Sequence, residues 1–343
     1  MSNAIQYPMV PGKGSSPSGH HLPGQNCDIH QPYYPNGRSF GEHGILESLL
    51  GTSLYPPRWE HVACDLCGAD DPVFLLEKDT FHYVRCRRCG LVYVTPRLRD
   101  HFLQQEEFYQ IVTEGNLEAA VKRDQNLTRM KFLTRIARSY LRYKHTGALL
   151  DVGCGFGAFL EAAASVGWRV YGVEVASVPT SIAGRRHDVF QGCLSDAPYG
   201  PDSFDVVRLN NVIEHALSPR ALVCDIRRVL RPKGLLTIST PNVESFTAAL
   251  QGAGWRYVQG GHHIYLFGLR TIRRLLETEG FKILWISTPG VRLIDKNGSL
   301  ETRPFFLRRP TGWAVKWAER TLDLAARIAM KGHRLRIRAE KAA

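Results

Sequence analysis

The sequence predicts an α/β fold, with a mainly parallel sheet and helices on both of its faces, and three observations carry this prediction. The first is the pattern of strand, glycine turn, helix and strand in residues 147–175, GALLDVGCGFGAFLEAAASVGWRVYGVEV. The second is that short apolar runs keep alternating with helical patterns as far as residue 287. The third is a pair of Cys-x-x-Cys motifs ahead of this region, which predicts a small separate unit.

The glycine turn lies at the centre of the predicted site. Gly153, Gly155 and Gly157 occupy alternate positions directly after Asp151, which ends the first strand. Residues without a Cβ let the chain turn sharply and let backbone N–H groups approach a ligand closely. Glu174 stands near the tip of the second strand, where an acid suits the two hydroxyls of a ribose. The pattern therefore predicts a site for a ligand that contains a nucleoside.

The GxGxG turn, together with the acid that precedes it, resembles motif I of class I S-adenosylmethionine (SAM)-dependent methyltransferases. The later phrase FDVVRLNNVIEH resembles a subgroup of small-molecule methyltransferases that carry LEH after the fourth strand. The resemblance covers about residues 60–290 and implies a Rossmann-like, seven-stranded methyltransferase sheet with SAM as cofactor. The residues that it implies for SAM are Asp151, Gly153, Cys154, Gly155, Gly157, Glu174, Val175, Cys193, Leu194 and Asn210.

One part of this pattern departs from the family. The loop that flanks the adenine often carries an aspartate there, whereas this chain has Cys193, with Asp196 three residues later. The adenine contact is consequently the least defined part of the predicted site.

The two cysteine pairs predict a structural Zn²⁺ site. Cys64-x2-Cys67 and Cys86-x2-Cys89 are separated by 18 residues, and each pair is followed by a glycine. Four thiolates at this spacing fit tetrahedral zinc. Because a closed four-cysteine site leaves no position for a substrate, a structural role is favoured over a catalytic one.

The predicted organisation has four parts. They are a disordered tail rich in Pro, Gly, Ser, Asn and His over residues 1–57, a zinc-ribbon unit over 58–97, a helical linker or lid over 98–146, and a methyltransferase domain over 147–343. Within the last part, the alternation of Leu335 and Ile337 with arginines predicts a seventh strand with a charged outer face. In the resembled fold this strand inserts antiparallel beside the sixth, which leaves about residues 290–332 as an insertion.

Charge and composition limit the partners. Apolar residues make up 44% of the 343 residues, and no apolar run approaches the ~18 residues that a membrane span needs. The N-terminus lacks the apolar region of a signal peptide, so a cytoplasmic protein is expected. The net charge of +12 favours acidic partners such as phosphates, anionic lipid or nucleic acid. The basic, aromatic segment 304–332 leaves peripheral membrane contact open as a second interpretation.

The chemistry expected at the site is transfer of a methyl group, with a base where the acceptor must lose a proton. His215, His262 and His263 are the candidate bases, because imidazole titrates near neutral pH. The fourth strand ends in Asn-Asn-Val-Ile and lacks the Asn/Asp-Pro-Pro-Tyr motif, which argues against methylation of exocyclic amino groups. Cys154 and Cys224 are poorly placed for nucleophilic attack on a pyrimidine, so oxygen and carbon acceptors remain.

The leading hypothesis is a methyltransferase that acts on a small molecule, a sugar or a glycan precursor. The zinc unit in front and the pattern HHxYxFxxxTxRxLLExxGF behind resemble bacterial enzymes that methylate such acceptors, and the basic charge suits a phosphorylated one. An RNA methyltransferase that uses the zinc unit to bind RNA is the competing enzyme hypothesis. A third hypothesis is a non-catalytic binding module, against which the complete glycine turn and both acids argue.

Overall fold

The structure is a computed structural model, and it describes residues 59–99, 117–124, 126–290 and 321–342. By its internal contacts the chain divides into two units, Met1–Arg38 and Ser39–Ala343, and every described residue belongs to the second. The predicted tail, much of the predicted linker and most of the predicted insertion lie outside the described residues.

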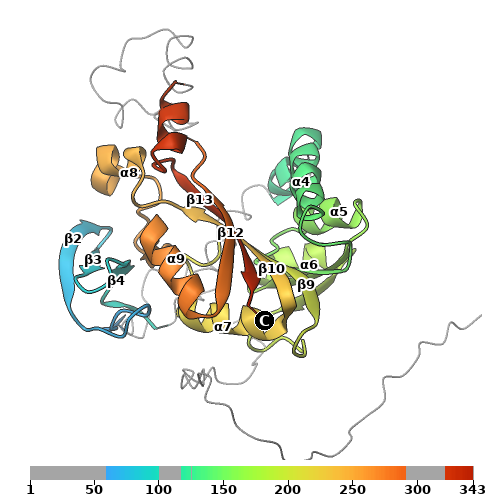
Figure 1. Ribbon diagram of the computed structural model, residues 1–343, viewed down its shortest axis with the longest axis horizontal. Coiled ribbons are helices and arrows are strands. Elements are labelled where there is room, and N and C mark those ends of the chain that lie inside the picture. The colour runs from blue at the N-terminus through green and yellow to red at the C-terminus, as the bar shows by residue number, and fades with distance from the viewer. Residues whose placement is uncertain (1–58, 100–116, 125, 291–320, 343) are drawn as a thin grey trace, which may run out of the picture. The chain divides into compact units, whose positions relative to one another are not determined.

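A seven-stranded sheet in the order β12-β13-β10-β9-β6-β7-β8 confirms the predicted fold class (Figure 1). Neighbouring strands from β10 to β8 pair in parallel, whereas β13 is antiparallel to both β10 and β12. The strand bounds are β6 (Ala148–Val152), β7 (Arg169–Glu174), β8 (Asp188–Gln191), β9 (Phe204–Asn210), β10 (Leu230–Pro241), β12 (Phe281–Ser287) and β13 (Arg334–Lys341). The seventh strand therefore lies beside the sixth, as the resemblance implied.

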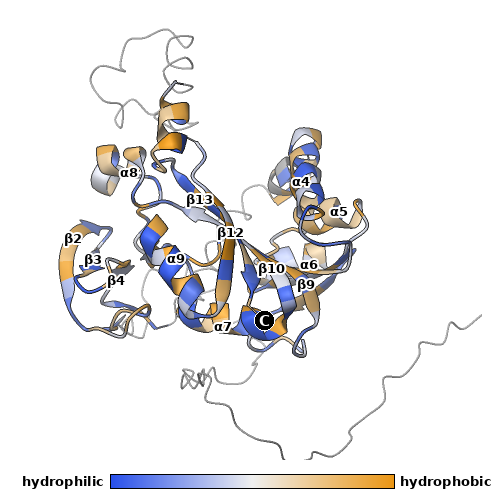
Figure 2. Cartoon of the chain, viewed as in Figure 1, coloured by the Kyte–Doolittle hydropathy of each residue, from blue (hydrophilic) through white to orange (hydrophobic). Residues whose placement is uncertain are grey.

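Helices follow most of these strands, and local sequence signals explain their limits. Ser218 caps α7 by accepting from the backbone N–H of Ala221, and Pro219 fits the first helical turn. The bounds are α3 (Leu117–Asp124), α4 (Leu127–Tyr140), α5 (Ala158–Ala164), α6 (Ser177–Ala183), α7 (Pro219–Val229), α8 (Phe246–Gln251), the 3-10 helix η1 (Gly252–Gly254) and α9 (Leu269–Thr278). Figure 2 shows both hydrophobic and hydrophilic residues along α9, as expected of a helix with one buried side.

The two faces of the sheet differ in polarity. Side chains alternate between the faces, so Val207 and Leu209 of β9 join the core beneath α7 and α9. Val206 joins a smaller core beneath α4 and α5, and the next two residues on that face are Arg208 and Asn210. The face under α4 and α5 thus changes from apolar to polar along β9. The polar residues at its end, Arg208 and Asn210, line the candidate site.

The cysteine pairs belong to a second, smaller sheet that shares a core with the first. Its order is β11-β4-β3-β2, and β1 pairs separately with β5. The bounds are β1 (Trp59–Glu60), β2 (Pro72–Lys78), β3 (Phe81–Cys86), β4 (Val92–Val94), β5 (Arg97–Leu98) and β11 (Tyr265–Leu266). Strand β11 comes from residues 241–267, which the sequence pattern indicated only as a long loop. Tyr83, Tyr93 and Tyr265 are all fully buried in the common core.

The described part of segment 304–332 begins at residue 321 and is helical over 321–328. It exposes Leu322, Leu324 and Ile328. No helix among the described residues is long and apolar enough to cross a membrane. Peripheral membrane contact by this segment stays a prediction, because most of the segment lies outside the described residues.

Candidate active site

The glycine turn adopts the backbone geometry that only glycine accepts readily. Gly153, Gly155 and Gly157 have φ angles of 70°, 55° and 83°, in the left-handed region. A Cβ on Gly153 would collide with the side chain of Val212, so the turn packs closely against the end of β9. A Cβ on Gly155 would meet no atom within 4 Å. The turn is therefore packed on its inner side and open at Gly155, where a ligand has room.

Glu174 is bound to this turn through its carboxylate. Its Oε2 accepts from the backbone N–H of Gly155 at 2.8 Å, and its Oε1 accepts from that of Ala176 at 3.1 Å. Glu174 is only 3% exposed, and burial raises the pKa of its carboxyl group. A carboxylate can accept about four hydrogen bonds, so Glu174 keeps capacity to accept from a hydroxyl group of a ligand.

Asp151, at the end of β6, forms a buried ion pair that the sequence analysis missed. Asp151 Oδ1 accepts from Arg208 Nη1 at 2.6 Å, and the two residues are register partners on adjacent parallel strands. The Arg208 guanidinium also lies 3.9 Å from the centre of the Phe159 ring. Among the described residues, none donates a hydrogen bond to the buried Asp151 Oδ2. A cationic or N–H-bearing ligand at the turn would satisfy this atom.

The remaining residues predicted to contact the cofactor lie around the same strand ends. Cys154 is buried, and a Cβ on Gly172 would lie 2.8 Å from its Sγ, so the thiol fills the space that this glycine leaves. Burial raises the pKa of Cys154, in keeping with a packing role. Cys193 is half-buried with a pKa raised to about 11 by burial, Leu194 is buried and Val175 is half-buried. The structure places these residues but does not assign them a ligand.

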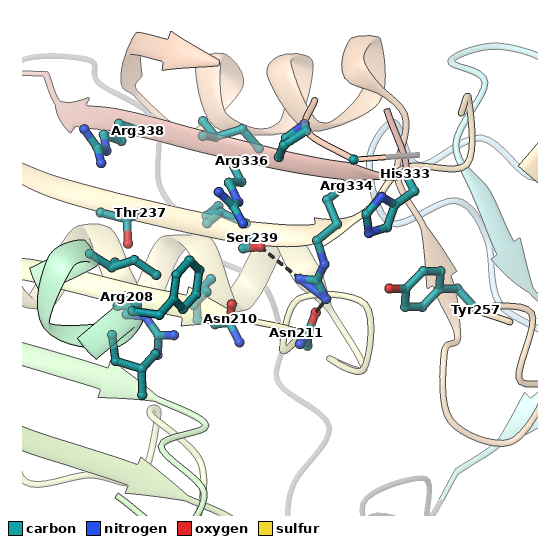
Figure 3. A pocket seen from close by; sticks show the side chains of 18 of the residues that line it. Arg208, Asn210, Asn211, Thr237, Ser239, Tyr257, His333, Arg334, Arg336 and Arg338 are labelled. Carbon is teal, nitrogen blue, oxygen red and sulfur yellow. Dashed lines mark hydrogen bonds between the residues drawn. The ribbon is translucent and has the colours of Figure 1, made fainter. Parts of the chain in front are cut away.

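A cavity of about 1240 Å³ opens where the polar residues of β9, β10 and β13 face α4 (Figure 3). Asn210 and Asn211 line it at the end of β9, which is where the predicted donor site begins. Asn211 has a φ of 55° and its N–H donates to Ser239 O at 2.8 Å, so it ends the strand in a tight bend. The volume exceeds the ~300–1,000 Å³ of an ordinary ligand pocket, so an acceptor larger than a single ring fits.

All three predicted bases line this cavity, and two of them, His215 and His263, lie close to the buried Glu214. The rings of His215 and His263 lie 4.7 Å apart between centroids, and their nitrogens and a Glu214 oxygen all lie within 4.8 Å of one another. His262 is half-buried, and its carbonyl accepts from His215 Nδ1 at 2.8 Å. His263 Nδ1 donates in the same way to Tyr257 O at 2.8 Å. A carbonyl only accepts, so both rings carry their proton on Nδ1 and leave Nε2 as the basic atom.

Burial sets the charge of this cluster. It lowers the pKa values of His215 and His263 to about 4, so both imidazoles are neutral near pH 7. Glu214 is 1% exposed, and burial raises the pKa of its carboxyl group. Its Oε2 accepts from Thr240 at 2.9 Å, while its Oε1 accepts from no described residue. The cluster therefore combines neutral imidazoles with an incompletely satisfied acid beside them.

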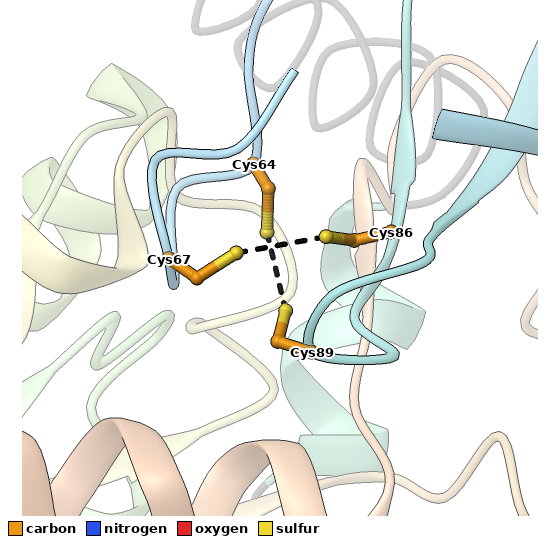
Figure 4. Close-up of side chains that lie close together, drawn as sticks. All are labelled: Cys64, Cys67, Cys86 and Cys89. Carbon is orange, nitrogen blue, oxygen red and sulfur yellow. Dashed lines mark hydrogen bonds between the residues drawn. The ribbon is translucent and has the colours of Figure 1, made fainter. Parts of the chain in front are cut away.

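The four cysteines predicted to bind zinc come together at one point (Figure 4). The Sγ atoms of Cys64 and Cys89 are 3.4 Å apart, and those of Cys67 and Cys86 are 3.6 Å apart. Tetrahedral zinc with Zn–S bonds of about 2.3 Å would set its sulfurs roughly 3.8 Å apart. The cluster fits zinc after a small expansion.

The cysteine unit also holds the loop that carries His263. The hydroxyl of Tyr83 on β3 donates to His263 O at 2.7 Å, and Val94 N on β4 donates to Ile264 O at 2.9 Å. Asp65, within the first Cys-x-x-Cys motif, accepts from Ser218 Oγ at 2.7 Å. The first Cys-x-x-Cys motif is thus hydrogen-bonded to the start of α7 as well. No sequence pattern indicated these contacts, because their partners are up to 180 residues apart.

The central part of the chain is similar to known proteins. Residues 123–285 match the model of a methyltransferase domain family. A ubiquinone biosynthesis O-methyltransferase of Cereibacter sphaeroides is 34% identical over 126 residues, which cover 34% of this chain and 51% of that protein. A probable S-adenosylmethionine-dependent methyltransferase of Mycolicibacterium smegmatis is 31% identical over 150 residues, which cover 42% and 56%. A crystal structure of a SAM-dependent methyltransferase from Archaeoglobus fulgidus matches with a TM-score of 0.44 and 19% identity, covering 62% of this chain and 94% of that one.

Residues 123–285 of the chain are thus similar to a methyltransferase domain, and a four-cysteine cluster lies ahead of them. The chain spans about half the length of these two curated relatives. The matched family region, residues 123–285, includes the glycine turn and the histidine cluster, whereas the four cysteines and β13 lie outside it.

Proposed function

We propose that this protein transfers a methyl group from SAM to a hydroxyl oxygen of a small-molecule acceptor held in the cavity. The observation that carries the proposal is that Asn210, at the end of β9 and next to the strand that leads into the glycine turn, lines the same cavity as His215, His262 and His263. Relatives named O-methyltransferases support oxygen as the acceptor atom. A sugar or glycan precursor is the acceptor class that the sequence motifs favour.

The residues at the glycine turn suit the parts of SAM. Glu174 would accept from the ribose hydroxyls, and Asp151 Oδ2, which no described residue satisfies, would accept from the amino group. The open space at Gly155 leaves room for SAM to lie against the turn. When bound there, SAM would supply an activated methyl group for in-line displacement. Asn210 would then border the reacting methyl, at the mouth of the acceptor cavity.

The histidine cluster would remove the proton from the acceptor hydroxyl. The carbonyl of Tyr257 fixes the tautomer of His263, so its Nε2 is the atom that accepts. The buried carboxylate of Glu214 would stabilise the imidazolium as it forms, because opposite charges interact strongly away from water. His215, held by His262 O, would fix the ring of His263 from its other side. In this arrangement His263 is the base, and Glu214 and His215 are positioning residues.

We propose a structural role for zinc at the four cysteines. Four thiolates would close the coordination shell, so the metal would take no part in methyl transfer. Its contribution would be to hold β3 and β4, which in turn hold the backbone of His263 and Ile264. Zinc would therefore act on catalysis through the position of the base.

Native mass spectrometry of the full chain tests the two ligands together. The proposal expects a mass increment of one zinc per chain, and a second increment on addition of SAM. Screening hydroxylated acceptors, including phosphorylated and nucleotide-linked sugars, with methyl-labelled SAM should then identify a labelled product. Zinc without SAM at saturating concentration would contradict the enzyme proposal and would favour a binding module.

A further inference from the structure

Three arginines on β13 form a row along one wall of the cavity (Figure 3). Arg334, Arg336 and Arg338 occupy alternate positions, so their side chains leave the same face of the strand at intervals of roughly 7 Å. Leu335 and Ile337, between them, are buried in the core on the opposite face. The alternation that predicted a charged outer face thus produces a charged cavity wall.

The row has no carboxylate partner among the described residues. Arg334 donates to the neutral oxygens of Ser239 at 3.0 Å and Asn211 at 2.5 Å. Arg338 donates to Ser139 Oγ at 2.7 Å, and its guanidinium also lies over aromatic rings, including that of Trp285 at 5.1 Å.

The guanidinium of Arg336, the middle member of the row, forms no hydrogen bond or ion pair with any side chain that the structure describes. Its side chain is half-buried, and it pairs in register with Ser239 of β10.

Three other arginines that line the same cavity are each paired with a carboxylate. Arg208 pairs with Asp151, Arg129 with Asp124 and Arg327 with Asp323, with N–O distances of 2.6, 2.6 and 2.8 Å. The arginines of the row on β13 differ from these three in having no carboxylate partner among the described residues. The row keeps its positive charge toward the cavity.

This concentration of like charge carries an electrostatic cost. Burial, together with Arg334, Arg327 and Arg338, lowers the pKa of Arg336. An anion between the guanidinium groups would offset the repulsion. The planar guanidinium fork matches phosphate oxygens in particular, because two N–H groups can donate to two oxygens at once.

The position of the row relative to the predicted donor site indicates which ligand would carry the anionic group. Arg334 is bonded to Asn211, the neighbour of Asn210 at the mouth of the predicted donor site, and Arg336 lies one strand repeat farther along β13. We propose that Arg336, flanked by Arg334 and Arg338, binds a phosphate or diphosphate group of the acceptor. The proposal rests on the proposed function, since it takes methyl transfer to occur in this cavity. The acceptor class is then a phosphorylated small molecule whose reacting hydroxyl lies near Asn210.

Inorganic pyrophosphate is the probe that tests this subsite in the full chain. Calorimetric titration should show binding by the wild type and roughly 10-fold or greater weakening in Arg336→Gln, as expected for loss of charge-assisted hydrogen bonds. Arg336→Lys keeps the charge but loses the fork, so it should bind with intermediate affinity. Arg270→Gln, on the exposed side of α9, is the matched control and should bind as the wild type does.

SAM affinity, measured on the same samples, separates the two proposals. Unchanged SAM binding in every variant, with weakened pyrophosphate binding only in the Arg336 variants, supports the subsite. No pyrophosphate binding by the wild type, or equal binding by Arg336→Gln, overturns the subsite while leaving the methyltransferase proposal intact. Failure of the wild type to bind SAM contradicts the proposed function instead. Displacement of pyrophosphate by a single-stranded RNA oligonucleotide, at lower concentration than by a sugar phosphate, would overturn the small-molecule class in favour of RNA.

Discussion

The proposed donor half of the site, around the glycine turn, and the proposed acceptor half, at the cavity, are built in different ways. The donor half, around the glycine turn, uses residues within one stretch, since Gly155 and Glu174 are bonded to each other only 19 positions apart. The acceptor half joins β3, β9, β11 and β13, and the contact of Tyr83 with His263 spans 180 positions. Charges also differ, because Asp151 is paired with Arg208 whereas Arg336 faces the cavity without a described partner.

This difference indicates how the two halves divide their tasks. A donor that is always the same molecule can be bound by a short, self-contained motif. An acceptor requires a surface with its own shape and charge, which long-range packing can vary without disturbing the motif. The four-cysteine cluster belongs to the acceptor half in this sense, since its sheet includes β11 beside His263.

The largest expected effect comes from breaking the cysteine cluster. Cys86→Ser should reduce zinc below one per chain and lower the free energy of unfolding by several kcal/mol, roughly half of what a structural zinc supplies. Hydrogen exchange should accelerate at residues 263–267 and change little at β6 and β7. Cys224→Ser, outside the cluster, is the control and should retain zinc. Equal acceleration in both halves would show that the cluster stabilises the whole fold and has no particular relation to the acceptor half.

A substitution at Gly155 should disrupt the donor half most selectively. Gly155→Arg should abolish SAM binding, because the side chain would occupy the open space in which we place the cofactor. Gly252→Arg is a matched control, since Gly252 has a similar φ of 51° and open space but lies in the 3-10 helix η1. Isothermal titration with SAM measures both. Unchanged affinity in Gly155→Arg would remove the cofactor from this turn.

Replacing the proposed base should lower the rate of methyl transfer and leave the affinity for SAM unchanged. His263→Gln is expected to lower kcat about 100-fold, the lower end of the contribution of a general base, with SAM affinity unchanged. Glu214→Gln should lower kcat by a smaller factor, because the carboxylate acts only through the imidazolium. Steady-state kinetics with the identified acceptor provide the measurement. A normal kcat in His263→Gln would assign the base to another residue.

The smallest expected effect is on the pH dependence of stability. His263 has a pKa of about 4 in the folded protein, below its unfolded value near 6.5, so the unfolded chain binds more protons between these pH values. Stability from this residue is therefore full above pH 6.5 and falls as the pH drops toward 4, by about 2 kcal/mol between pH 7 and pH 5. Denaturant unfolding of wild type and His263→Gln at both pH values should show a smaller loss in the variant. The same loss in both would mean that His263 is not held neutral by burial.

The fold class and the four-cysteine cluster could be predicted from the sequence, and the assignment of SAM to the donor half stays a prediction. The glycine turn and the clustering of the four cysteines follow from spacing within short stretches, whereas the arrangement of the sheet followed from the resemblance to methyltransferases. The acceptor half was only partly predictable. His215, His262 and His263 were candidates from the sequence, which left open whether Glu214 orients His215, since an acid next to a histidine in sequence does not indicate which way it points. The sequence placed Arg336 on the outer face of the predicted strand. The alternation of apolar and basic residues defines the two faces of a strand, but it does not show what packs against each face.

A crystal structure of the full chain with S-adenosylhomocysteine would test the junction of the two halves most directly. The account predicts ribose hydroxyls on Glu174, the amino group near Asp151, and the sulfur beside Asn210 facing the cavity that His263 and Arg336 line. A ligand whose sulfur points away from this cavity, or one bound outside the glycine turn, would contradict it.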